Sequence, residues 1–398
     1  MSTPTTDREL IDIRRHLHAN PELSQKEEKT AEFIERRLQD FGFNDIQRVA
    51  DTGVVALLEG ANEGPCRGYR ADIDALPIQE ANDVDYCSTN PGVMHACGHD
   101  VHTTVGLGVA RQLQQRRDEL EGSVKLIFQP AEEATPEDEP VGAERMVQQG
   151  VLEAPEVDAV FALHCMPSLP VGHIGYTGGP VWAGSELLEI EIRGKKSHGA
   201  YPHEGVDAVA VGSQVVVALQ QVVSRNLDAR DCCVISIGHI EAGNTYNVLA
   251  DTAKMTGIVR GLSEKVIDDA QAAIQRTAEG VAAALGAEAI VRFTSGARPV
   301  INDVQLETAA VDVIRQRVGA SVPVAHPPQL GAEDFSAFSR RVPGCYLFLG
   351  IRNEDRGIVH PLHTPEFDVD EDCIATGVAA MTEVLLHPSH CTTSSQSL

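Results

Sequence analysis

The 398-residue chain contains no run of about 18 apolar residues, so no membrane-spanning helix is expected. The first ten residues, MSTPTTDREL, have neither a basic region nor an apolar stretch, and we expect no export signal. Basic residues are scarce: 32 Lys and Arg stand against 58 Asp and Glu, a formal net charge of -26 that either solubility or adaptation to high salt explains. This charge argues against nucleic acid and anionic membranes as partners. We therefore expect a globular protein of the cytoplasm.

Signals for disulfide pairing are also missing. The nine cysteines are an odd number, no CxxC pair occurs, and only Cys232 and Cys233 are adjacent. We expect most of these thiols to be reduced and buried. Cys97 stands apart, because it lies in MHACGHDVH, residues 94–102, with three histidines and an aspartate. One buried histidine would be ordinary, but this density of ligand-type side chains needs another explanation.

The first part of the chain has α/β character. Apolar residues at helical spacing predict helices over residues 6–20 and 28–43, and strands and helices alternate after them. Such alternation predicts a largely parallel sheet covered by helices. The predicted strands at 66–78, 122–130 and 158–167 each run into acidic residues or histidine. In open α/β sheets, ligands bind at the edge formed by the carboxyl ends of the strands.

The pattern changes near Ser185. Strands of period 2 follow, together with two long helices at 205–225 and 265–286, and the chain then returns to α/β character. We therefore predict a smaller domain, 183–297, inserted into a discontinuous larger domain. The larger domain comprises residues 1–182 and 298–388, and residues 389–398 are expected to be a disordered tail.

Two short motifs carry candidate metal ligands. Cys97 and His99 lie two residues apart at the predicted start of a helix, where a helix N-terminus and a nearby cation favour thiolate; a tight turn would also explain them. Glu132 and Glu133 close the strand ending in QPAEE. They are either part of a solvated acidic loop or have separate roles, one as a metal ligand and the other as a general base beside an activated water.

Two further histidines, His164 in FALHCMP and His363 in PLHTPEF, lie at predicted strand or loop ends, where each alone could be a core histidine. Five ligands together suit two divalent ions that share a bridging group. Mixed sulfur, nitrogen and oxygen donors fit Zn²⁺, with Mn²⁺, Co²⁺ or Ni²⁺ as alternatives. Asp72 and Asp74 are candidates for orienting His99 through its other ring nitrogen, although a strand-end turn also explains Asp74.

Taken in order, a set of motifs resembles the M20 metallopeptidase family over nearly the whole chain; the motifs are RADIDALPI, HACGHD, QPAEE, FALHCMP, GKKSHGAYPHEGVDA, NTYNVLAD, LGAEDF and LHTPEFDVDED. The nearest branch contains the N-acyl amino acid, hippurate and indole-acetyl amino acid hydrolases. The resemblance implies an α/β, zinc-exopeptidase-like catalytic domain with an inserted, smaller α+β lid domain that dimerises. It also implies a homodimer or a dimer of dimers.

The resemblance also implies roles for the ligand residues. Cys97 would bridge two divalent ions, His99 and His164 would hold one ion, and Glu133 and His363 the other. Glu132 would then be the general base.

Three residues of the predicted inserted domain receive roles only from the resemblance. His198 would reach the active site of the neighbouring subunit and stabilise the oxyanion. Asn247 and Arg260 would hold the amide or the carboxylate of the substrate. Without the resemblance, His198 would be taken for a turn residue, and a strand salt bridge would explain Arg260 equally well. Where the family usually has a glycine-rich run, this chain has EAGNTYNVLAD. The pocket wall that this segment contributes is therefore altered, and the sequence does not identify the substrate.

The predicted activity is that of a metal-dependent amidohydrolase acting on linear amides. It would cleave an N-acyl or aryl-acyl amino acid into a carboxylic acid and a free amino acid by water attack, with Glu132 as the base. One alternative is an M20-type deaminase or carbamoyl-amide hydrolase. A second is a non-catalytic protein that binds metal or ligand on a peptidase fold.

Overall fold

The computed structural model describes residues 7–134 and 140–387. These residues form two compact units. The first consists of the described residues up to Gly179, Ile301–Pro327 and those from Ala337 onward, and the second of Pro180–Val300 and Pro328–Ser336. The tail expected at 389–398 lies outside the described residues.

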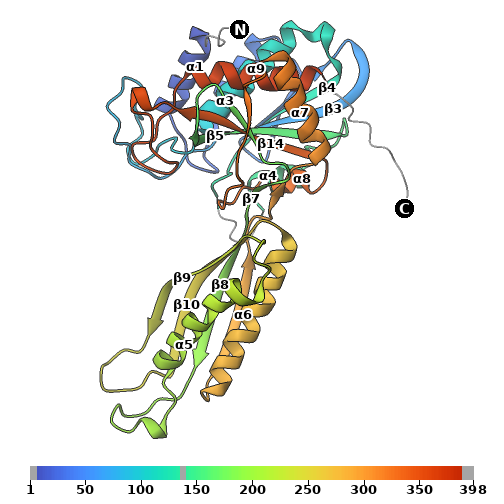
Figure 1. The fold of residues 1–398 in the computed structure, drawn as a ribbon. Coiled ribbons are helices and arrows are strands. Elements are labelled where there is room, and N and C mark those ends of the chain that lie inside the picture. The colour runs from blue at the N-terminus through green and yellow to red at the C-terminus, as the bar shows by residue number, and fades with distance from the viewer. Residues whose placement is uncertain (1–6, 135–139, 388–398) are drawn as a thin grey trace, which may run out of the picture. The chain divides into compact units, whose positions relative to one another are not determined.

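The first unit is built on an eight-stranded sheet (Figure 1). In spatial order its strands are β1 (Ile46–Val49), β2 (Gly53–Glu59), β4 (Glu121–Gln129), β3 (Asn62–Asp72), β5 (Ala159–Pro170), β14 (Gly344–Arg352), β6 (Ile174–Tyr176) and β13 (Pro323–Ala325). The central pairs β4–β3, β3–β5 and β5–β14 are parallel, whereas β1–β2, β2–β4 and β14–β6 are antiparallel. The prediction of a largely parallel sheet is thus confirmed at its centre.

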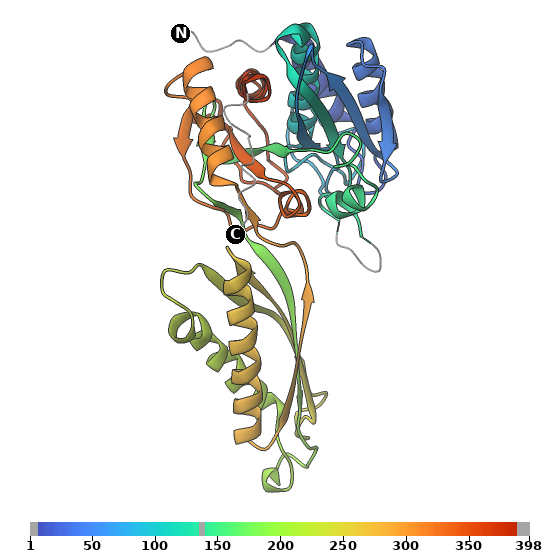
Figure 2. The same ribbon diagram turned by 90° about the vertical axis from the view of Figure 1, so that its right-hand side faces the viewer.

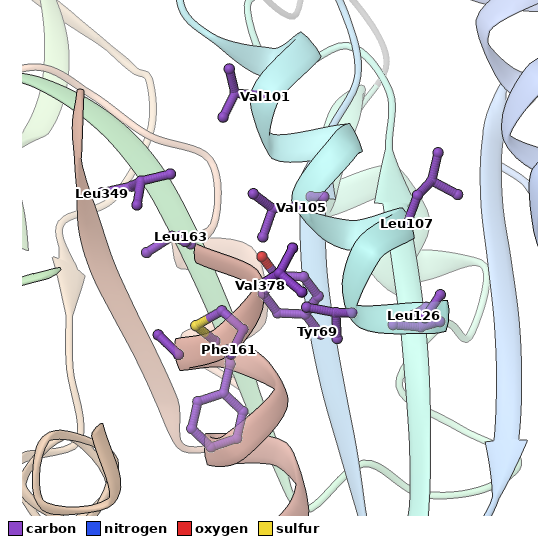
Figure 3. Packing of buried hydrophobic residues seen from close by; sticks show 14 of the residues in the cluster. Tyr69, Val101, Val105, Leu107, Leu126, Phe161, Leu163, Leu349 and Val378 are labelled. Atoms are coloured by element: carbon purple, nitrogen blue, oxygen red, sulfur yellow. The ribbon is translucent and has the colours of Figure 1, made fainter. Parts of the chain in front are cut away.

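Helices cover this sheet because its central strands are apolar on both faces. They are α1 (Arg8–Ala19), α2 (Glu28–Asp40), α3 (His99–Gln115), α4 (Gly142–Gln148), α7 (Val304–Arg317), α8 (Ser336–Ser339) and α9 (Asp372–Leu386), with short 3-10 turns at Arg117–Glu119 and Glu354–Arg356. The two helices predicted near the N-terminus are present as α1 and α2. Figure 3 shows Val105 of α3 and Val378 of α9 beside Leu163 of β5, in the main core cluster of this unit.

The second unit pairs an antiparallel sheet with two helices. The sheet has the order β11 (Glu288–Ser295), β8 (Gly184–Arg193), β10 (Thr252–Gly261) and β9 (Cys233–Ala242), and its helices are α5 (Ala208–Gln221) and α6 (Glu264–Ala284). Burial alternates along β8, where Leu188, Ile190 and Ile192 join the same core cluster as residues of both helices. Figure 2 shows the long α6 lying along this sheet. The remaining short elements are β7 (Pro180–Trp182), β12 (Val300–Ile301) and a 3-10 turn at Pro202–Glu204.

The long helix predicted over 205–225 differs from the observed one in its last turn. α5 ends at Gln221 and continues as a π-helical turn, Val222–Asn226. In the described part of the chain, Ala208–Asn226 is one helix that is long and apolar enough to cross a membrane by length and composition alone. Helices of globular cores also meet this criterion, and 33% of the tested window is buried.

Candidate binuclear metal centre

Three neighbouring strands, β4, β3 and β5, bring part of the predicted site residues of the first unit to one edge of the sheet, while Cys97, His99 and His363 come from the loop before α3, from α3 itself and from a loop near the C-terminus. Asp72 at the end of β3 is the register partner of Gln129 at the end of β4, and β5 lies on the other side of β3. His164 lies within β5 rather than at its end, because the strand continues to Pro170. The sequence prediction that it closes the strand is therefore wrong, although its position near the carboxyl edge is right.

The loop that carries Cys97 and His99 depends on the glycine between them. Gly98 precedes α3 with φ of 86°, a left-handed conformation that glycine adopts without strain. A Cβ at this position would lie 2.9 Å from the Cβ and Sγ atoms of Cys165. The loop can therefore pass against β5 only with glycine at this position.

The five predicted ligands come together in two overlapping groups. In each group the ligand atoms lie within 4.8 Å of one another; the groups are Cys97 with His99 and His164, and Cys97 with Glu133 and His363. The Sγ atom of Cys97 lies 3.5 Å from Nε2 of His164 and 3.3 Å from Nε2 of His363. A cysteine shared by both groups is the arrangement that a bridging ligand between two ions requires.

Hydrogen bonds orient two of these histidines toward the centre. Nδ1 of His99 lies 2.9 Å from the carbonyl oxygen and 3.1 Å from Oδ1 of Asp74, and Nδ1 of His164 lies 2.8 Å from the carbonyl oxygen of Cys165. Carbonyl oxygens accept only, so each Nδ1 carries the proton and each Nε2 has a lone pair available for a cation.

The donor atoms of the site fit a bound cation. Among the described residues, Nε2 of His99 and Oε1 of Glu133 are buried without a hydrogen bond, although the latter lies 3.2 Å from Nε2 of His363. Buried polar atoms are rarely left unpaired. Burial raises the pKa of the Cys97 thiol well above its usual value, and the carboxylates of Glu133 and Glu132 raise it further. A nearby cation would favour the thiolate form against these effects.

Buried carboxylates also act on His99. Burial lowers its pKa, but the carboxylates of Asp72 and Asp74 outweigh burial and raise the pKa to about 10. A positive charge is therefore favoured at this position, and a divalent ion would supply it in place of the proton.

The prediction that Asp72 orients His99 through its other ring nitrogen is wrong. Asp74 occupies that nitrogen, while Oδ1 of Asp72 lies 2.5 Å from Nδ1 of His102 and Oδ2 lies 2.7 Å from Nη1 of Arg70. Nε2 of His102 accepts the backbone N–H of Cys165, the residue after His164. Both nitrogens of His102 are therefore in use, and this histidine supports the site rather than binding metal.

The paired glutamates follow a left-handed turn. Ala131 has φ of 55°, which turns the chain at the end of β4, and the N–H of Glu133 donates to Oδ2 of Asp74 at 3.0 Å. Ligand atoms of His99, Glu132 and Glu133 lie within 4.8 Å of one another. Glu132 is thus close to the predicted ligands, at a distance that suits a base acting on a water between them.

The other three predicted residues lie in the second unit. His198 and Asn247 are neighbours, because the segments that carry them pair through the N–H of Gly199 and the carbonyl of Asn247 at 2.8 Å. Nδ1 of the exposed His198 accepts the N–H of Ala200, so Nε2 carries the proton and can donate it. Among the described residues, Nη1 of Arg260 on β10 is buried without a hydrogen-bond partner.

An α/β unit with two overlapping ligand groups at the carboxyl edge of its sheet defines a two-metal protein of the α/β class. Comparison with known proteins gives the family. Residues 68–387 match the model described as peptidase family M20/M25/M40, and the chain belongs to this family.

The similarity to individual proteins extends over most of the chain. It is 45% identical over 294 residues to the N-acyl-L-amino acid amidohydrolase of Geobacillus stearothermophilus, covering 74% of this chain and 78% of that protein. It is 38% identical over 371 residues to the N-acetyl-L-cysteine deacetylase of Bacillus subtilis, covering 93% and 86%. The crystal structure of the Bacillus subtilis YXEP protein, described as a dinuclear metal binding peptidase from the M20 family, matches with a TM-score of 0.83 at 35% identity, covering 95% and 96%.

Proposed function

We propose that the protein is a metal-dependent amidohydrolase that cleaves N-acyl or aryl-acyl amino acids into a carboxylic acid and an amino acid. The observation that carries the proposal is the convergence of two overlapping ligand groups beside Glu132. The names of the relatives support it, since both curated relatives described above act on N-acyl amino acids.

The geometry of the ligand groups supports the metal roles that we propose. Cys97 would bridge two divalent ions, with His99 and His164 on one ion and Glu133 and His363 on the other. We propose Zn²⁺ or Mn²⁺, with Co²⁺ and Ni²⁺ as alternatives, because the set combines sulfur, nitrogen and oxygen donors. Bound ions of this kind polarise an amide carbonyl and make a coordinated water more acidic.

The chain's own residues would carry out the proton transfers. Glu132 would accept a proton from the attacking water and pass it to the leaving amine. His198 of a second copy of the chain would donate a hydrogen bond from Nε2 to the carbonyl oxygen as its negative charge grows. Asn247 would hold the substrate amide, and the guanidinium of Arg260 would pair with the substrate carboxylate, since its Nη1 has no hydrogen-bond partner among the described residues.

We propose a homodimer in which residues 183–297 form the dimerisation and lid domain, while 1–182 and 298–388 form the catalytic domain. Within the described chain, β9 lies at one edge of its sheet with no strand beyond it (Figure 1). Ile240 on β9 is 53% exposed and Val217 on the adjacent α5 is 65% exposed. An exposed apolar edge strand is a template for pairing with another chain.

We also propose a cytoplasmic location. All eight cysteines in the described part of the chain are free, as expected in a reducing compartment.

The activity is tested by dialysis against a chelator, restoration of metal, and assay on N-acetyl, N-benzoyl and indole-acetyl amino acids. Metal-dependent release of the carboxylic acid would support the proposal. Release of ammonia would identify a deaminase, and binding without any product would identify a binding protein.

The role of Glu132 is tested by Glu132→Gln. The substitution removes the base but keeps the shape of the side chain, so turnover should fall by about 100- to 10,000-fold while the metal content stays at the wild-type level. Glu156→Gln, at an exposed glutamate, is the control. Wild-type turnover in Glu132→Gln would contradict the assignment.

A further inference from the structure

Glu27 is a buried carboxylate outside the ligand set described above. It precedes α2, but its side chain makes no capping hydrogen bond to that helix, and the residue is 0% exposed. Its hydrogen bonds go elsewhere. Oε1 accepts the backbone N–H of Gln25 at 3.0 Å and of Ala131 at 2.8 Å, and Oε2 accepts the hydroxyl of Thr52 at 2.7 Å. The carboxylate thus joins three separate segments of the chain.

These segments are the strained ones. Of the six non-glycine residues with positive φ in the described chain, four lie here: Gln25 (64°), Ala50 (54°), Asp51 (66°) and Ala131 (55°). A left-handed backbone is unfavourable for a residue with a Cβ, so it persists only where the surroundings enforce it. All four residues line one small cavity of about 10 Å³. The hydrogen bonds of Glu27 run to this region.

The turn at Ala131 directly precedes Glu132. Glu27 holds the N–H of the residue before Glu132, and Asp74 holds the N–H of the residue after it, at 3.0 Å. The backbone of Glu132 is therefore fixed on both sides by buried carboxylates. A base must lie within hydrogen-bond reach of the proton that it removes, and small displacements reduce the rate strongly.

We propose that Glu27 is a positioning residue for the general base: its carboxylate holds the strained turn at Ala131 and thereby sets the position of Glu132. This inference rests on the proposed function. The three groups that Glu27 binds are two backbone N–H donors, which need an acceptor, and a hydroxyl, which can either donate or accept. None of them requires a negative charge on the side chain. Burial, opposed by the hydrogen bond from Thr52, raises the pKa of Glu27. An amide should therefore replace the carboxyl group well, with its oxygen toward the N–H groups and its NH₂ toward the hydroxyl.

The test compares Glu27→Met, which keeps the length of the side chain but removes both acceptors, with Glu27→Gln, which keeps one. Glu22→Met is the matched control, because Glu22 also accepts a backbone N–H and a hydroxyl, both from Thr30. In Glu27→Met we expect kcat to fall about 10- to 100-fold with KM and metal content unchanged. Glu27→Gln should restore most of kcat, and Glu22→Met should keep it.

A second measurement does not depend on catalysis or metal. Hydrogen exchange of the Ala131 amide in the metal-free protein should be faster in Glu27→Met and unchanged in Glu22→Met. Should Glu27→Met fail to fold, Thr52→Val removes one hydrogen bond and should change kcat and exchange in the same direction to a smaller extent. Wild-type kcat or wild-type exchange in the folded variant, or an equal loss of kcat in Glu22→Met, would overturn the proposal. Absence of amide hydrolysis by the wild type would instead overturn the proposed function, and the exchange experiment would still test Glu27.

Discussion

A buried histidine on α1 links three parts of the first unit. Nε2 of His18 lies 3.1 Å from Oε1 of Glu80, and Nδ1 lies 2.8 Å from Oδ2 of Asp100. Burial and the charge of Arg14 lower the pKa of His18, but its hydrogen bonds to the two carboxylates outweigh both and raise it. Burial raises the pKa of Glu80, but hydrogen bonds from His18 and from the N–H of Ser88 lower it to about 2.

The lowered pKa of Glu80 predicts how stability depends on pH. A carboxylate of this kind stabilises the fold above its unfolded pKa of about 4.3, and the contribution is lost as the pH falls toward the folded value of about 2. Glu80→Gln should therefore be less stable than the wild type at pH 6, and the difference should shrink as the pH is lowered from about 4.3 to 2. Urea unfolding at several pH values measures this, with the exposed Glu63→Gln as control. A difference independent of pH would contradict it.

At the level of single residues, the sequence predicts ligands better than their supports. Cysteine, histidine and paired glutamates are unusual at strand ends, so they could be picked out before their distances were known. Glu27 could not be, because it lies in the polar stretch ELSQKEEK and its burial depends on contacts with Thr52 and Ala131. Both Asp72 and Asp74 were candidates for orienting His99, and the sequence could not choose between them for a similar reason: only the path of the chain beyond β3 decides which carboxylate meets His99.

At the level of elements, strands that are buried or alternate clearly were predictable. β11 was not predicted, because it is an edge strand without one fully buried residue, and its pattern of exposure does not alternate. The end of β5 was also missed: the strand was predicted to end at residue 167 but continues to Pro170, because MPSLP contains two prolines that weaken the strand signal.

The start of α3 provides an element-scale prediction. Gly98→Ala should lower the free energy of unfolding by roughly 1–2 kcal/mol for the left-handed backbone and by about 1–3 kcal/mol more for contact with Cys165. Metal content should fall as well, since Cys97 and His99 flank the glycine. Gly92→Ala is the control, because Gly92 also has positive φ (77°) but open space for a Cβ. Urea unfolding and metal analysis test this, and equal losses in the two variants would refute it.

At the level of the whole molecule, the alternation of strands and helices predicts the class of fold, but it does not predict the surface that meets a partner. Side-chain periodicity shows which face of a strand is buried and cannot show which edge of a sheet stays open. In the second unit both β11 and β9 are edge strands. Of these two strands, β9 carries a large apolar side chain that is strongly exposed, that of Ile240. Val209 and Val217, 45% and 65% exposed, lie on α5, which contacts β9. The hydrophobic effect therefore favours association through β9 and α5.

A double variant, Val217→Lys with Ile240→Lys, should separate the proposed dimer without unfolding either unit, because both side chains are already exposed in the single chain. A lysine on an edge strand is unfavourable for pairing, and the net charge of the protein changes only slightly toward zero. Analytical ultracentrifugation should give the mass of one chain for the variant and of two for the wild type. Val304→Lys, at a 56% exposed position of α7 in the first unit, should remain dimeric. If His198 acts in the neighbouring chain, the monomeric variant should keep its metals and lose kcat; a dimer that survives both lysines would show that association uses another surface.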